Sequence, residues 1–272
     1  MLRYKQGIFS LIILTLIHLT FHILTVYGLS GMFSFHWLWL TLIGIILIRN
    51  VGGEIGGHRY YSHKSFKAKT WAEWAMSILF VYSYSGTMLL WSIAHRYHHV
   101  TSDTKKDPVS PHFIKNIKDF LVYFRFIFQL LDTEDKEYEK WNRANKFNMD
   151  VLKNEPARFV HNNYWLFALA PILLLLIDIR LLIYFIAIPS VITIWSFILS
   201  NTLSHINLTG CYKNFVIPDR SVNNPWMQLL LSTSGLHNNH HYNPSSYNLK
   251  MTDKWYEQDF LNVFLIEKFL KA

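Results

Sequence analysis

Long stretches without a charged side chain constrain this chain more than any other feature. Residues 7–48 contain no Asp, Glu, Lys or Arg. A membrane-spanning helix needs about 20 apolar residues, so this run fits two spans, which we place at about 8–28 and 32–50. A secretory signal peptide is the alternative for the first span. However, the apolar core of a signal peptide has only about 7–15 residues and a small-residue cleavage site should follow it, so a retained span is the better interpretation.

Two more uncharged runs cover residues 159–177 and 181–212. Asp178 and Arg180 are the only charged residues between them. The pair predicts a second tight helical hairpin, with spans at about 159–177 and 181–203. The predicted fold class is therefore an all-α membrane protein with four transmembrane helices in two hairpins.

The distribution of positive charge predicts the orientation in the membrane. Two hairpins return the chain to its starting side, so the N-terminus, residues 51–158 and residues 204–272 share one face. Of the 26 Lys and Arg residues, only Arg180 falls in a turn on the other side. Because positive residues concentrate in cytoplasmic loops, we expect one domain over residues 1–272 with both termini and a helical cap in the cytoplasm. The net charge of +8 then reflects topology and contact with membrane lipids, and nucleic acid need not be invoked.

One further uncharged run, residues 74–94, is long enough for a fifth span. If it crossed the membrane, the histidine-rich segments on its two sides, residues 58–63 and 95–99, would face opposite compartments. We therefore expect it to dip into the membrane or to lie along the surface.

The chain has 14 histidines against 18 acidic residues, and most of them are grouped. The groups are EIGGHRYYSH from residue 54, AHRYHH from residue 94, SNTLSH from residue 200 and GLHNNHH from residue 235. In HxxHH the three rings project from one helical face, and Asn201 and His205 share a face in the same way. Neutral imidazole binds iron, copper, nickel or zinc. Nine such ligands are too many for one ion and suit two ions at four or five each. The nine are His58, His63, His95, His98, His99, His205, His237, His240 and His241.

The remaining histidines lack such a pattern. His18 and His22 lie inside the first predicted span without a partner group, and hydrogen bonding between helices is a better interpretation of them than metal binding. We assign no role to His36, His112 or His161.

Three carboxylates are candidates to support the metal ligands from behind. Asp103 and Asp107 follow the second histidine group, and Glu54 lies four residues before His58. Each could accept a hydrogen bond from an imidazole N–H, or simply be a solvated loop or interfacial acid. The arginines within the groups, Arg59 and Arg96, could meet an anionic headgroup or pair with these acids. No substrate-binding residue is identified.

The order HRYYSH, HRYHH, NTLSH and HNNHH resembles the integral-membrane fatty acyl desaturases, the group that contains stearoyl-CoA desaturases. The similarity extends to HHVTSDTKKDP at the second group and to DRSVNNP before HNNHH. HNNHH followed by NPSS and WYEQD is most similar to bacterial and cyanobacterial members. The resemblance covers roughly residues 40–265 and is specific in the histidine motifs.

The resemblance implies a mushroom-like protein with four spans and a cytoplasmic cap that holds two iron ions (Fe²⁺/Fe³⁺) at the nine histidines. It also implies that Asn201 reaches one iron through a water molecule. The expected reaction is O₂-dependent desaturation that introduces a cis double bond near the middle of a saturated C16–C18 chain, as in Δ9 desaturases. No haem domain of the HPGG type is fused to the chain, so electrons would come from a separate ferredoxin or cytochrome b5-like donor.

Two departures from the family pattern matter. The family usually has Gly-Glu-Gly before the group that corresponds to HNNHH, where this chain has Thr233-Ser234-Gly235. Ser234 in place of the acid removes one supporting contact. Ile93 and Ala94 stand where animal acyl-CoA enzymes tend to carry a charged pair, so the acyl carrier stays open among coenzyme A, acyl carrier protein and an acyl lipid.

Two alternatives to desaturation remain. The same ligands can serve an acyl hydroxylase or an acetylene-forming enzyme, because the product depends on how the chain is placed at the metal. A metal-binding membrane protein without catalytic activity is the alternative from another class. A transporter is disfavoured, since the spans contain no ionisable path beyond His18, His22 and His36.

Overall fold

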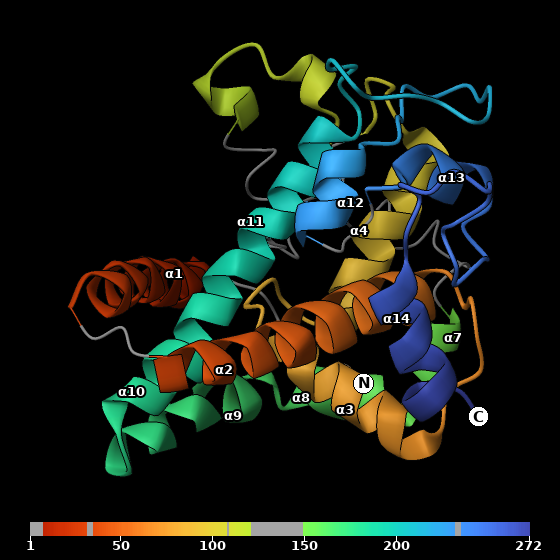
Figure 1. Ribbon diagram of the computed structural model, residues 1–272. Helices are drawn as coiled ribbons and strands as arrows, with labels where there is room; N and C mark the ends of the chain where they lie inside the picture. Colours follow the sequence, from red (N-terminus) through yellow and green to blue (C-terminus); the bar gives the residue numbers. More distant parts are fainter. Residues whose placement is uncertain (1–7, 32–34, 108, 121–148, 232–234) are drawn as a thin grey trace.

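The computed structural model describes residues 8–31, 35–107, 109–120, 149–231 and 235–272, and Figure 1 shows how they are arranged. Within these ranges the chain forms helices joined by loops, and the β pairing consists of isolated bridges between single residues. The helices of the first half are α1 (Ile8–Gly31), α2 (Phe35–Gly44), η1 (Ile45–Ser62), α3 (Thr70–Val81), α4 (Met88–Thr101) and η2 (Pro111–Phe113). Those of the second half are α7 (Met149–Lys153), α8 (Glu155–Asn162), α9 (Tyr164–Leu169), η4 (Ala170–Leu176), α10 (Ile179–Leu181), η5 (Leu182–Ala187), α11 (Ile188–Leu203), α12 (Pro225–Leu231), α13 (His237–Tyr242), α14 (Phe260–Leu265) and η6 (Ile266–Leu270).

Three helical stretches are long and apolar enough to cross a membrane. They are Ile12–Ser30, Phe35–Ser62 and Ile179–Leu203. A fourth candidate is the pair Glu155–Asn162 and Tyr164–Leu176, whose two halves meet at an angle of 73°. The chain is therefore an all-helical membrane protein with three or four candidate spans in its described part.

The helices differ in detail from the predicted spans. The second predicted span ends near residue 50, but α2 and η1 form one continuous helix that runs to Ser62 and carries the first histidine group with it. The helix at the third predicted span bends at Asn163, where the backbone leaves helical geometry with φ −116° and ψ 28°.

The uncharged run at residues 74–94 is divided between α3 and α4. The connection between them contains two residues with positive φ, Tyr84 at 52° and Gly86 at 89°. Thr87 then caps α4, because its side chain accepts a hydrogen bond from the backbone N–H of Leu90. The two helices have 12 and 14 residues, so each is shorter than a span.

The helix η1 lies at the centre and packs against α3, α4, α11 and α14. Its contact with α3 depends on glycine, since a Cβ on Gly52 would lie 2.8 Å from the backbone of Leu79 and Phe80. A Cβ on Gly56 would meet the Met76 side chain at the same distance. Small residues of this kind let two helices approach closely, as in other membrane proteins.

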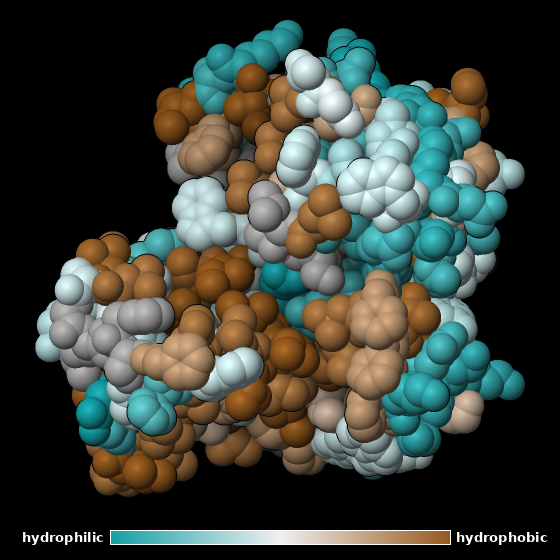
Figure 2. All heavy atoms as spheres, viewed as in Figure 1, coloured by the Kyte–Doolittle hydropathy of each residue, from teal (hydrophilic) through white to brown (hydrophobic). Residues whose placement is uncertain are grey.

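Apolar and polar surfaces are separated. Figure 2 shows hydrophobic atoms gathered over α1, α2, α9 and α10 at the lower left, and hydrophilic atoms along the right side and at the top, around α13. Large apolar side chains such as Leu19, Ile23, Leu173 and Leu176 are exposed on the apolar part. Such a surface is stable in contact with lipid.

Candidate metal centre

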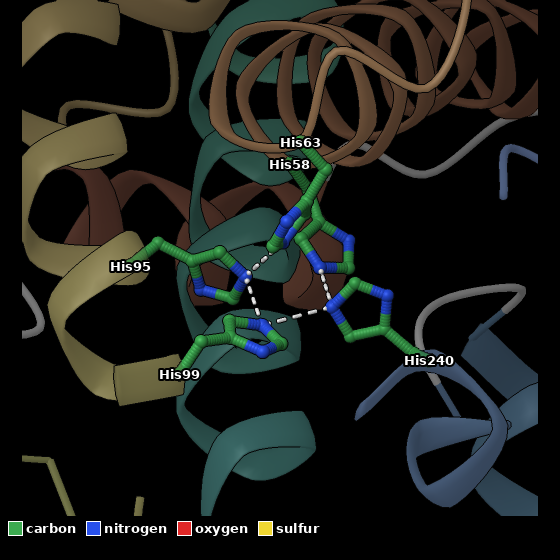
Figure 3. A group of neighbouring side chains, drawn as sticks. All are labelled: His58, His63, His95, His99 and His240. Atoms are coloured by element: carbon green, nitrogen blue, oxygen red, sulfur yellow. Dashed lines mark hydrogen bonds between the residues drawn. The ribbon is translucent and has the colours of Figure 1, made fainter. Parts of the chain in front are cut away.

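The nine histidines of the four sequence groups lie together in two clusters, whose nitrogen atoms are within 4.8 Å of one another in each. We call them the five-histidine cluster, drawn in Figure 3, and the four-histidine cluster. The first contains His58, His63, His95, His99 and His240. The second contains His98, His205, His237 and His241. The sequence spacing therefore identifies every histidine of both clusters.

Each HxxHH group divides between the two clusters. In α4, His95 and His99 point into the five-histidine cluster and His98 into the other. The HNNHH group has the opposite division: His237 and His241 of α13 belong to the four-histidine cluster, and His240 to the five-histidine cluster. The outer pair, four residues apart, shares one side of the helix, and the ring between them is rotated toward the neighbouring cluster. Two short helices thus contribute rings to both clusters, and His58, His63 and His205 come from other parts of the chain.

The five-residue spacing of His58 and His63 fits the local backbone. The helix η1 is a π-helix, whose hydrogen bonds link residues five apart, and His63 caps its end. In such a helix residues five apart lie closer to one face than in an α-helix. The two rings accordingly sit 5.3 Å apart, centre to centre. π-Helical segments are rare and occur frequently at functional sites.

The rings present the same nitrogen, Nε2, to the centre of each cluster. In the five-histidine cluster the Nε2 atoms form a chain of contacts: His58 to His240 at 2.9 Å, His240 to His99 at 3.0 Å, His99 to His95 at 3.0 Å and His95 to His63 at 2.9 Å. In the four-histidine cluster, Nε2 of His205 and His237 are 3.0 Å apart. His98 and His241 have buried Nε2 atoms without a hydrogen-bond partner among the described residues. Convergent imidazole nitrogens without N–H acceptors suit a metal cation.

Carboxylates accept hydrogen bonds from Nδ1 of four of the nine rings, so that Nε2 of each of these rings faces the cluster. Asp107 bonds His98 at 3.0 Å, Asp103 bonds His205 at 2.8 Å and Glu54 bonds His58 at 3.2 Å. These three acids are the candidates named from the sequence. A proton on Nδ1 leaves the Nε2 lone pair free for a metal and makes the ring a stronger ligand.

Sequence reasoning missed the fourth carboxylate. Asp219 accepts a hydrogen bond from Nδ1 of His241 at 2.7 Å. It is the first residue of the DRSVNNP segment, and it lies 22 positions before its partner along the chain. The similarity of that segment to the desaturases was the available signal, but spacing alone gave Asp219 no role.

The clusters favour neutral imidazole. Burial lowers the pKa of five rings well below the ordinary value, and neighbouring imidazoles lower it further. Burial also lowers the pKa of His205, although Asp103 partly opposes this. Burial opposes ionisation of Asp103 as well, but its hydrogen bonds with His205, the Arg220 N–H and Ser110 hold its pKa well below the usual range. The five rings with strongly lowered values are His63, His95, His99, His240 and His241.

Ion pairs, of which one is buried and one is partly buried, fix the segments that carry the histidines. Arg59 is fully buried and makes two hydrogen bonds to Asp259, at 2.6 and 3.0 Å, and two to Glu54, at 3.1 and 3.4 Å. Arg96 pairs with Asp150 at 2.9 Å. Both arginines therefore pair with acids. For Arg59 one partner is Glu54, a candidate named from the sequence, whereas Arg96 pairs with Asp150, which the sequence reasoning did not name.

The asparagines of HNNHH are structural. Asn239 donates to Glu257 at 3.1 Å and to the Leu249 carbonyl at 2.9 Å. Asn238 accepts hydrogen bonds from the backbone N–H groups of Asn214 and Phe215. The acids of WYEQD are thus buried anchors: Glu257 for the HNNHH group and Asp259 for the HRYYSH group.

Asn201 lies between the clusters. It lines a cavity of about 50 Å³ together with His58 and His95 of the five-histidine cluster and His237 of the four-histidine cluster. Trp91 and Phe197 form the apolar part of the same wall. The side-chain amide of Asn201 donates to the Val109 carbonyl at 2.7 Å.

The other histidines are placed elsewhere. His22 of α1 accepts from the Trp195 indole of α11 at 3.0 Å, which confirms hydrogen bonding between helices for this residue. His18 contacts the Tyr84 carbonyl at 3.1 Å, in the connection between α3 and α4. His161 bonds Thr87. His112 was assigned no role, yet it contacts the His205 carbonyl at 2.8 Å and lies 3.6 Å from Asp103.

The sequence pattern of a known family covers most of the chain. Residues 33–265 match the fatty acid desaturase pattern. The chain belongs to the fatty acid desaturase family. This family member is 28% identical to an acyl-CoA 5-desaturase of Anemone leveillei, over 88% of its own length and 73% of the relative's. It is 26% identical to delta-9 acyl-lipid desaturase 2 of Arabidopsis thaliana, over 82% and 70% of the two chains.

A cyanobacterial relative is similarly close. The sn-2 palmitoyl-lipid 9-desaturase of Nostoc sp. is 29% identical over 77% of this chain and 72% of the relative. The family resemblance found in the sequence is thus confirmed, and the protein is an oxidoreductase that acts on fatty acids. Ser234, where the family usually has Glu, lies outside the described residues.

Proposed function

We propose that this desaturase is O₂-dependent and introduces a cis double bond into a saturated acyl chain at two iron ions. The observation that carries the proposal is the convergence of nine Nε2 atoms in two adjacent clusters. Five histidines would hold one iron, and four would hold the other, with Asn201 completing that site through water. Bound iron would supply the activation of O₂ needed to break two unactivated C–H bonds, which no side chain provides.

The described residues have separate tasks in this proposal. Asp103, Asp107, Asp219 and Glu54 would hold a proton on Nδ1 of their partner rings and keep each Nε2 free. The apolar wall of Trp91 and Phe197 would exclude water from the cavity between the clusters. A dry and shaped site of this kind limits reaction to one position of a bound chain.

The proposed arrangement in the membrane follows the charges and the helices. Four spans in two hairpins, the last two at Glu155–Leu176 and Ile179–Leu203, would leave both termini on one side. The excess of Lys and Arg would make that side cytoplasmic. Residues 1–272 would then act as a single domain with the histidine clusters in a cytoplasmic cap.

The substrate proposal draws on the relatives. Their names include acyl-CoA and acyl-lipid desaturases and the positions Δ5 and Δ9. We propose a C16–C18 chain desaturated at a Δ9-like position, carried by an acyl lipid, coenzyme A or acyl carrier protein. A ferredoxin or cytochrome b5-like protein would supply the electrons.

The fatty-acid profile of a desaturase-deficient host that expresses the chain tests this proposal. We expect a new monounsaturated C16–C18 acid whose double bond lies near the middle of the chain. A His98→Ala variant should not form this acid. Hydroxylated or acetylenic acids as the products would show that the same centre catalyses hydroxylation or acetylene formation in place of desaturation. No new lipid, with two irons bound and a working donor present, would overturn the proposed activity.

A further inference from the structure

The carboxylates behind the two clusters differ in their access to solvent. The side chains of Asp107, Asp103 and Glu54 are 0%, 4% and 5% exposed. The side chain of Asp219 is 14% exposed, and it lies 2.7 Å from Nδ1 of His241. Of these four, Asp219 is the most exposed carboxylate that bonds a cluster ring.

Positive residues surround this position. Lys213 and Arg220 are exposed on the loop that carries Asp219, and Lys213 donates to the Asp219 carbonyl at 3.1 Å. The backbone N–H of Arg220 donates to Asp103 at 2.8 Å, and the exposed Lys105 and Lys106 follow Asp103 in the same turn. We call Lys105, Lys106, Lys213 and Arg220 the basic rim.

An apolar patch adjoins the rim. Phe215 stacks on the exposed Tyr242, with ring centres 3.8 Å apart, and Val216 is fully exposed. Tyr242 directly follows His241. The loop and α13 lie at the upper right of Figure 1, where Figure 2 shows a mainly hydrophilic surface and no apolar belt. An apolar centre bordered by one sign of charge is suited to steer and bind a partner of the opposite charge.

We propose that this surface, from the basic rim to Tyr242, is where an acidic one-electron carrier protein docks to deliver electrons to the four-histidine cluster. The inference rests on the proposed function. Conversion of a –CH₂–CH₂– unit to –CH=CH– releases two electrons and two protons, and reduction of O₂ to two waters takes up four of each. Two carrier molecules are therefore each oxidised by one electron, and two protons come from water.

A charge-reversal pair tests the docking surface. The variant is Lys213→Glu with Arg220→Glu, and the matched control is Lys115→Glu with Lys118→Glu, two exposed lysines on the segment at the upper left of Figure 1. Each pair lowers the net charge by the same amount. Binding of a plant-type [2Fe–2S] ferredoxin to the metal-free protein in nanodiscs is measured at low and high salt, and the soluble haem domain of cytochrome b5 serves as a second probe.

We expect association of the carrier to slow about tenfold in the rim variant at low salt, with a smaller salt dependence, and to stay near the parent value in the control. Equal effects of the two pairs, or none, would overturn the docking surface. Because binding is measured without metal or substrate, this outcome is independent of the proposed function, which fails only if no double bond is formed.

Discussion

The two histidine clusters share helices α4 and α13, yet their surroundings differ. Three of the four rings in the four-histidine cluster bond a carboxylate through Nδ1: His98, His205 and His241. In the five-histidine cluster His58 alone has such a bond among the described residues, and its partner Glu54 is shared with Arg59. The negative charge of three carboxylates would therefore offset the charge of a metal ion in the four-histidine cluster. In the five-histidine cluster, binding of the ion would depend more on the larger number of imidazole ligands.

The largest expected effect is the loss of a ligand. His98→Ala removes one of four rings, so we expect desaturation to fall below detection and the iron content to drop from two toward one per chain. Product analysis and metal determination on the purified protein measure both. His36→Ala, an exposed histidine on α2, is the matched control and should change neither. Full activity of the His98 variant would remove that ring from the site.

The supporting carboxylates give the sharpest contrast between the clusters. Asp103→Asn keeps an oxygen near His205 but removes the charge, and we expect iron affinity of the four-histidine cluster to fall about 10–100-fold. Glu54→Gln should have a smaller effect, confined to the other cluster, since this carboxylate also serves Arg59. Chelator titration measures the release of each iron, with Asp253→Asn on the exposed surface as control. Equal loss from both clusters in either variant would contradict the contrast.

The ion pair behind the five-histidine cluster predicts an effect on stability. Asp259→Asn leaves the fully buried Arg59 with Glu54 as its remaining carboxylate, and we expect a loss of about 3 kcal/mol. Thermal unfolding in detergent measures it. Asp178→Asn, whose ion pair with Arg180 is exposed, should unfold like the parent. An unchanged unfolding temperature for the Asp259 variant would mean that the pair contributes little.

Acid should destabilise the metal-free protein. The pKa values of His63, His95, His99 and His240 are lowered by burial, so between pH 6.5 and the folded values the unfolded chain binds more protons. Stability then falls as the pH falls below about 6.5. We expect a loss of at least about 1 kcal/mol between pH 7 and 5.5, a shift of about 2–4 °C in the unfolding temperature. A flat profile would contradict neutral rings in the clusters.

Local spacing predicted the nine histidines and three of the four carboxylates because each lies within a short motif. The division of His98 and His240 from their neighbours could not be predicted, since it depends on how α4 and α13 face each other. Asp219 was missed for the same reason, as a loop brings it to His241. The extension of the second helix to Ser62 was missed because charged and histidine residues within it ended the apolar signal at residue 50.

The measurement that tests the account most directly is anomalous scattering at the iron absorption edge from crystals of the iron-loaded protein. The account predicts two peaks, one among the Nε2 atoms of each cluster, and loss of the peak at the four-histidine cluster in the His98→Ala variant. A single peak between the clusters, or iron bound outside them, would contradict it.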